Sequence, residues 1–135
     1  MSDLVRDAMV PEPFALAASA SAQDAGEALS RDEVRAVFVC DDHKLVGVIT
    51  RKTLVRAVVA AGRDPQQTTL GEIAEPPNAT IESSLGLADG FQFLEENDYE
   101  RVPVVEDGRL VGVLSRAVVQ RRLAEDEPVS DTDGV

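Results

Sequence analysis

Short apolar runs and polar turns alternate along the chain, and the same alternation occurs twice. Residues 34–40 (VRAVFVC) and 45–49 (LVGVI) are rich in β-branched residues and flank the polar segment DDHK, which predicts a hairpin. Residues 101–105 (RVPVV) and 110–114 (LVGVL) flank EDGR, whose Asp-Gly step is a strong hairpin signal. Apolar residues lie on both faces of these strands, so we expect helices to cover the sheet.

Helical patterns precede each hairpin. Ser21, with Asp24 three residues later, predicts a capped helix start, and the alanines that follow favour close packing against a neighbour. Ser84 precedes apolar residues at helical spacing, and this helix is expected to end near Asn97.

A third helix is predicted after the first hairpin. Thr50 stands where an N-cap belongs, Gly62 is expected to stop the helix, and a short helical turn is expected at 69–74. The predicted apolar stripe of this third helix consists of Leu54, Val55, Val58 and Val59.

The two halves align without a gap when the chain is shifted by 65 residues. The segment 45–51 (LVGVITR) then meets 110–116 (LVGVLSR), so glycine, hydroxyl and arginine are all in phase. This indicates an internal duplication in which each half reads strand, helix, strand, strand, helix. A half of about 60 residues buries little surface alone, so we expect the copies to pack together about a pseudo-twofold axis.

The doubled segment resembles a tandem pair of CBS domains, regulatory modules named after cystathionine β-synthase. The resemblance implies an α/β (α+β) fold of two pseudo-symmetric β-α-β-β-α CBS repeats packed as one CBS-domain pair. We expect repeat 1 at 4–62, a linker at 63–77, and the repeat 2 core at 78–124, with that repeat starting near 69. Residues 125–135 are acidic and lack apolar periodicity, which predicts a disordered tail.

The resemblance also implies a function. Such a module senses AMP, ADP, ATP or S-adenosylmethionine in clefts between the repeats and signals to a partner protein; no cofactor is required. It would form a homodimer and, at this length, act as a stand-alone regulatory protein. The alternative is a ligand-free dimerisation or protein-interaction scaffold of the same fold.

The family pattern implies two ligand-binding clefts in this sequence. The first is expected to combine Thr50, Arg51, Thr53, Thr80, Ile81, Tyr99 and Arg101. The second is expected to combine Ser115, Arg116, Val118, Ala15, Leu16, Val34 and Ala36.

The start of the helix in each copy suits phosphate binding, since backbone amides there favour an anion and Arg51 or Arg116 supplies positive charge. Thr50 and Ser115 either cap these helices or donate to phosphate, and Tyr99 either stacks on adenine or packs internally.

The sequence departs from the family at the position three residues after the hydroxyl. The family often has Asp there, which accepts hydrogen bonds from ribose hydroxyls, whereas this chain has Thr53 and Val118. Val118 offers no hydrogen bond, so the first cleft, with Thr53, Tyr99 and Arg101, is the better candidate.

Composition narrows the classes of function that remain for this chain. The net charge of −12 disfavours nucleic-acid binding, and Cys40 is the only cysteine, so no disulfide framework exists. His43 is the only histidine, which leaves no metal cluster and no Ser-His-Asp set; we expect no enzymatic activity. Neither a signal peptide nor a membrane span is evident, and a cytoplasmic location is expected.

Overall fold

The computed structural model describes residues 3–11 and 14–126, which fall into two compact units. Among the described residues, unit 1 comprises 3–11, 80–104 and 111–126, and unit 2 comprises 14–79 and 105–110. Both units mix helices with strands, which confirms the predicted α+β class. From residue 127 onward, the predicted acidic tail lies outside the described residues. No helix within the described ranges is long and apolar enough to cross a membrane.

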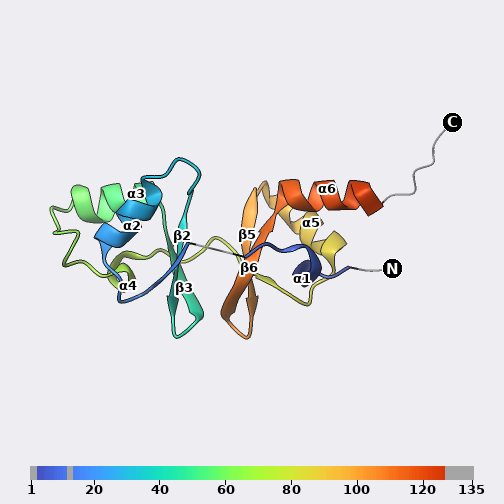
Figure 1. Cartoon of the computed structure of the whole chain (residues 1–135), viewed down its shortest axis with the longest axis horizontal. Coiled ribbons are helices and arrows are strands. Elements are labelled where there is room, and N and C mark those ends of the chain that lie inside the picture. The colour runs from blue at the N-terminus through green and yellow to red at the C-terminus, as the bar shows by residue number, and fades with distance from the viewer. Residues whose placement is uncertain (1–2, 12–13, 127–135) are drawn as a thin grey trace. The chain divides into compact units, whose positions relative to one another are not determined.

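Unit 2 holds the first predicted hairpin and the helices around it (Figure 1). Strand β1 runs parallel to β2, and β2 pairs antiparallel with β3, with Phe38 opposite Val48. Helices α2 and α3 pack against each other and against this hairpin. In chain order the elements of unit 2 are β1 (Ala15–Ala17), α2 (Ala22–Leu29), β2 (Val37–Asp41), β3 (Lys44–Ile49), α3 (Arg51–Leu54), the π-helix η1 (Val55–Val59) and α4 (Leu70–Ile73).

Helix α2 begins at the predicted capping box. The Ser21 hydroxyl accepts from the Asp24 N–H at 3.1 Å, and the Asp24 carboxylate accepts from the Ser21 N–H at 3.2 Å. These two bonds satisfy amide donors at the start of the helix. The apolar face of α2 then joins a core cluster of Ala22, Ala25, Leu29, Val34, Val37, Val39, Ile49, Val58, Leu70 and Ile73.

The apolar stripe predicted after Thr50 is wrong for two of its four members. Val58 is 5% exposed, but Val55 is 56% and Val59 is 72% exposed. This segment is a π-helix, in which the Ala60 N–H donates to the Val55 carbonyl at 2.8 Å, an i→i+5 bond. The side of the segment that packs on the core carries Leu54, Ala57 and Val58 instead.

Unit 1 holds the second hairpin, except its tip at 105–110, together with helices α5 and α6, which pack against each other (Figure 1). Helix α5 ends at Asn97 as predicted, and its N-cap is Gly86, two residues after the Ser84 that marks the predicted start. The elements are α1 (Val5–Ala8), β4 (Ile81–Glu82), α5 (Leu87–Asn97), β5 (Arg101–Glu106), β6 (Arg109–Ser115) and α6 (Arg116–Asp126).

Each unit takes its first short helix from the other sequence repeat. Helix α1 lies in unit 1 with the second hairpin, and α4, its counterpart 65 residues later, lies in unit 2 with the first. In unit 2, Val48 exchanges backbone hydrogen bonds of 2.8 and 3.0 Å with Glu75. In unit 1, Val113 exchanges bonds of 2.8 and 2.9 Å with Val10. The predicted duplication is therefore present in the backbone geometry as well as in the sequence.

Two glycines allow these segments to approach the strands. A Cβ at Gly47 would lie 2.6 Å from the Cβ of Ala74, and a Cβ at Gly112 would lie 2.8 Å from the Val10 carbonyl oxygen. Since real Cβ atoms do not approach other atoms so closely, glycine is required at both places.

Candidate functional site

The junction of β3 and α3 carries a polar cluster, called here the Thr50 half-site and formed by Thr50, Arg51, Thr53 and Glu75. Thr50 is the N-cap of α3, as predicted, and its hydroxyl accepts from the Thr53 N–H at 3.3 Å. In return, the Thr53 hydroxyl accepts from the Thr50 N–H at 3.1 Å. The two hydroxyl oxygens lie 3.1 Å apart, so this reciprocal cap fixes both side chains at the end of the strand.

Glu75 adds a carboxylate to this cluster. The Thr53 hydroxyl donates to Glu75 Oε1 at 3.4 Å, and Thr53 itself is only 2% exposed, whereas Glu75 lies at the surface. The backbone of Glu75 is fixed by its two hydrogen bonds to Val48. Sequence reasoning missed Glu75, although the 65-residue shift that aligns the repeats places it opposite Val10.

Arg51 brings positive charge to the same cluster. Its guanidinium donates to the Arg31 carbonyl oxygen at 2.8 Å, and the side chain is exposed. A guanidinium has five N–H donors, so this single bond to a neutral carbonyl leaves donors for an anion. The structure therefore combines a hydroxyl pair, a carboxylate and an arginine within one unit.

The corresponding cluster in unit 1, called here the Ser115 half-site, consists of Ser115, Arg116, Val118 and Val10. The Ser115 hydroxyl accepts from the Val118 N–H at 3.4 Å, which is again a helix cap. Val118 and Val10 occupy the positions of Thr53 and Glu75 in the repeat. This half-site accordingly lacks the hydroxyl and carboxylate of its counterpart.

Arg116 is held by acidic neighbours in its own unit. Its guanidinium donates to Glu100 at 2.8 Å and to Asp98 at 3.3 Å. The hydrogen bond to Glu100 is the main reason that the pKa of Arg116 is raised above its usual value, and Asp98 adds to it. An anion at Arg116 would have to compete with these two carboxylates, which is not so at Arg51.

The other residues predicted for the first cleft belong to unit 1. Ile81 is buried, while Thr80 and Arg101 are exposed. The half-buried Tyr99 ring packs on Phe93, with 5.9 Å between ring centroids and 59° between planes. The structure brings Thr50, Arg51 and Thr53 together within unit 2; their grouping with the unit 1 residues stays a prediction.

The other residues predicted for the second cleft belong to unit 2. Ala15 is exposed, Leu16 and Ala36 are half-buried, and Val34 is 2% exposed within the hydrophobic core. Their grouping with Ser115, Arg116 and Val118 likewise stays a prediction.

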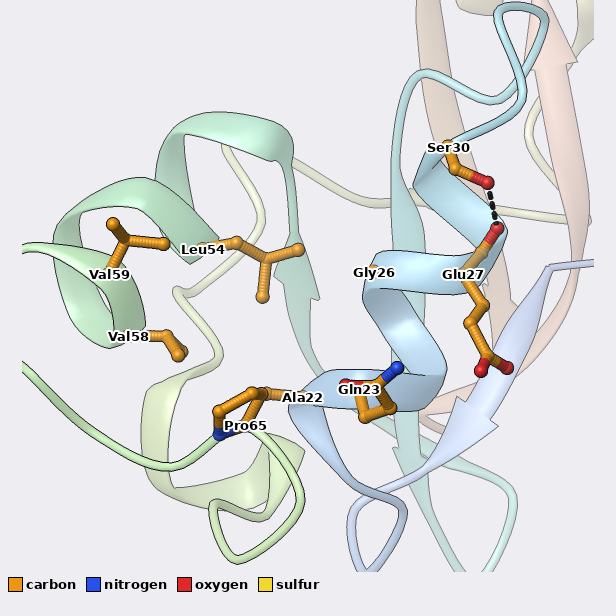
Figure 2. Close-up of a pocket in the computed structure, with 9 residues that line it drawn as sticks. All are labelled: Ala22, Gln23, Gly26, Glu27, Ser30, Leu54, Val58, Val59 and Pro65. Carbon is orange, nitrogen blue, oxygen red and sulfur yellow. Dashed lines mark hydrogen bonds between the residues drawn. The ribbon is translucent and has the colours of Figure 1, made fainter.

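An apolar groove, called here the α2–η1 groove, lies between α2 and the helical segment α3–η1, and has a volume of about 330 Å³. Figure 2 shows Leu54, Val58 and Val59 on one side and α2 on the other, with the exposed Val59 at the helical segment. This groove was not predicted from the sequence. The alanines of α2 and the apolar residues after Thr50 were each predicted to pack against neighbours, and members of both sets line its two sides. The lining residues are Ala22, Gln23, Gly26, Glu27, Ser30, Leu54, Val58, Val59 and Pro65.

Metal ligands do not gather at either half-site. Among the described residues there is no group of three or more His, Cys, Asp and Glu side chains able to hold a metal ion. Cys40 is half-buried, and burial raises the pKa of its thiol, so the less reactive protonated form is favoured.

Comparison with known proteins follows the same division of the chain. The family model described as CBS domain matches residues 5–60 and again residues 70–125. Hypoxic response protein 1 of Mycobacterium tuberculosis is 31% identical over 102 residues, which are 75% of this chain and 71% of that protein.

Solved structures agree with this match. The structure of Hypoxic Response Protein I with two coordinated zinc ions has a TM-score of 0.73 at 26% identity and covers 89% of this chain and 98% of that one. The structure of CBSX2 in complex with AMP has a TM-score of 0.69 at 28% identity and covers 90% of this chain and 96% of that one.

Proposed function

The chain belongs to the CBS domain family as a tandem pair, and from this premise we propose that it is a regulatory module that binds an adenosine-type ligand. The ligand class comprises AMP, ADP, ATP and S-adenosylmethionine. Binding changes the state that the module presents to a regulated partner protein. CBS-domain proteins are regulatory modules, and a relative of similar fold carries AMP in its solved structure.

The Thr50 half-site is the observation that carries this proposal. A nucleotide has an anionic end and a sugar with hydroxyl groups, and the half-site offers a partner for each. Arg51 uses one guanidinium N–H to bind the Arg31 carbonyl oxygen, and its remaining N–H donors bind and neutralise phosphate. The Thr50 hydroxyl reaches a phosphate oxygen by turning its O–H away from the Thr53 hydroxyl oxygen, which lies 3.1 Å away and has its own proton on Glu75. The Glu75 carboxylate, bonded to the buried Thr53 hydroxyl, supplies acceptors for the sugar hydroxyls.

Calorimetric titration of the full chain with AMP, ADP, ATP and S-adenosylmethionine tests the proposal. We expect at least one of them to bind. If that ligand is a nucleotide, Arg51→Gln should weaken its binding about tenfold, because a charge-assisted hydrogen bond is lost. Arg56→Gln is the matched control, since Arg56 is exposed on η1 outside the half-site and should leave affinity unchanged. Absence of heat and of any melting-temperature shift with all four compounds contradicts the proposal.

A ligand-free dimerisation scaffold is the second candidate, and the α2–η1 groove favours it. Val59 is 72% exposed and lines the groove together with Ala22 and Gly26, and Val55, four residues earlier on η1, is 56% exposed. A two-fold dimer needs one self-complementary patch, and this face offers both protruding and recessed apolar surface. The occupant proposed is a second copy of this chain.

Light scattering after size-exclusion chromatography tests the scaffold. The wild-type chain is expected to be a dimer, and Val59→Glu is expected to shift it to monomer because a charge would be buried at the contact. Val46→Glu is the matched control, since Val46 is an exposed valine outside the groove. A wild-type monomer, or a dimer equally stable with Val59→Glu, contradicts the scaffold.

A further inference from the structure

Beyond the different partners of Arg51 and Arg116, the two half-sites differ in the chemistry of one further pair of positions. In unit 2 the pair is Thr53 and Glu75, joined by a hydrogen bond of 3.4 Å. In unit 1 the pair at the equivalent positions is Val118 and Val10. A carboxylate and its hydroxyl neighbour in unit 2 are thus both replaced by valine in unit 1.

This difference does not arise from a change in fold. Glu75 and Val10 each form the same two-way backbone bridge, to Val48 and Val113 respectively. Each segment approaches a strand glycine, Gly47 in one unit and Gly112 in the other, closely enough to exclude a Cβ there. The two segments are therefore held alike, and Glu75 differs from Val10 in its side chain alone.

The chemistry of the Thr53–Glu75 pair suits hydroxyl groups. Thr53 is 2% exposed, and its hydroxyl is already engaged by Thr50 and Glu75. A carboxylate has about four lone-pair positions, so the contact with Thr53 leaves most of the acceptor capacity of Glu75. Two adjacent hydroxyls can donate to one carboxylate, as ribose hydroxyls do to acidic residues in dinucleotide sites.

The positive and negative groups of the half-site also determine the orientation of a bound nucleotide. Glu75 repels phosphate, whereas Arg51, whose bonded partner is a neutral carbonyl oxygen, attracts it. A nucleotide would place its phosphate toward Arg51 and its sugar hydroxyls toward Glu75. At Val118 and Val10, neither acceptor is present.

We propose that Glu75 is a ligand-binding residue that selects ligands with two adjacent hydroxyls, and that it makes the Thr50 half-site the one that binds the ribose of a nucleotide. This inference rests on the proposed adenosine-type ligand and adds the residue and the sugar chemistry that it recognises. The Ser115 half-site, with valine at both positions, does not bind ribose hydroxyls.

Calorimetric titration with AMP, 2′-deoxy-AMP and 3′-deoxy-AMP tests this role on the full chain. The wild type is expected to bind AMP about tenfold more tightly than either deoxy analogue, because each analogue lacks one hydrogen bond to a charged acceptor. Glu75→Gln keeps the size of the side chain and removes its charge. It should weaken AMP binding about tenfold and bring AMP and its analogues close to equal affinity.

Glu95→Gln is the matched control, since it removes one exposed charge from α5 in unit 1 and should leave the preference for AMP intact. Melting temperatures of both variants should match that of the wild type, which separates a binding effect from a folding effect. Tight AMP binding that Glu75→Gln does not change, or equal binding of AMP and its deoxy analogues by the wild type, overturns the role of Glu75 alone. A wild type that binds none of the three probes overturns this role for AMP, and failure of ADP, ATP and S-adenosylmethionine to bind as well overturns the adenosine-type ligand itself.

Discussion

The two hairpin tips differ in the backbone strain that their residues impose. Asp42 and His43 form the first tip with φ of 52° and 70°, and Asp107 and Gly108 form the second with φ of 52° and 79°. Both central residues of such a turn need positive φ, a conformation that favours glycine. The second tip has glycine where it is needed, whereas the first places histidine there.

His43→Gly is therefore expected to stabilise the protein by about 1 kcal/mol, because it removes the left-handed strain of a side chain with a Cβ. The reverse change at the other tip, Gly108→Ala, should destabilise by about 1 kcal/mol. Chemical denaturation of both variants checks this. A loss of stability in His43→Gly would show that the histidine side chain contributes more than the strain it imposes.

Gly47 and Gly112 are expected to tolerate no larger residue. Gly47→Ala and Gly112→Ala should each destabilise by about 2 kcal/mol, because the new methyl group lies under 3 Å from neighbouring atoms. Gly26→Ala is the control: its nearest neighbour is 3.9 Å away, and alanine favours the helix. Urea denaturation compares the three, and equal stabilities would contradict the close approach seen at both strands.

Single residues of the candidate site were predictable where the signal was local. Thr50 caps α3, and Ser115 accepts from Val118 across the same three-residue spacing, as the sequence predicts. Glu75 was not predictable, because it lies 22 residues after Thr53 and is brought there by its bridge to Val48 of β3. The pairing of Arg116 with Asp98 and Glu100 is likewise a tertiary contact.

At the scale of elements, the first residue of a helix could be predicted from the sequence only where a side chain caps the helix. The start of α2 at Ser21 was predictable because the capping residue and its partner Asp24 are both local. The start of α5 was not, since its N-cap is Gly86 and no side-chain bond marks it. The π-helix η1 has no such sequence signature, and two apolar residues of the predicted stripe, Val55 and Val59, lie exposed on it.

Ser21→Ala is expected to destabilise the protein by about 1 kcal/mol, since the Asp24 N–H loses its side-chain acceptor. Ser84→Ala is the comparison: Ser84 is exposed and is not the cap of α5, so its removal should change stability by less than about 0.5 kcal/mol. Thermal unfolding followed by circular dichroism measures both. An equal loss in the two variants would contradict the assignment of Gly86 as the N-cap.

At the scale of the whole molecule, the duplication was predictable but the exchange of first helices was not. Sequence alignment of the repeats does not reveal that α1 packs with the second hairpin and α4 with the first. The exchange depends on contacts between residues far apart in the sequence. The segments after α1 and α4 each approach a strand at a glycine, Gly112 or Gly47, and such an approach cannot be read from the sequence alone.

Val5→Ala tests this exchange, because Val5 is fully buried in α1 and approaches Gly90 of α5. We expect a loss of about 2 kcal/mol from the cavity left behind. Hydrogen exchange should accelerate at Leu87, whose amide donates to Asp3 in unit 1. The Val48 amide, in unit 2, should keep its protection. Acceleration confined to unit 2 would contradict the placement of α1.

Backbone amide shifts measured during titration with AMP test the ligand-binding role most directly. With AMP at saturation, the largest changes are expected at Thr50, Arg51, Thr53 and Glu75, because these residues carry the hydroxyls, the charge and the carboxylate of the Thr50 half-site. Only small changes are expected at Ser115 and Val118. A spectrum that AMP leaves unchanged, or changes confined to Ser115, Arg116 and Val118, would contradict the proposed site.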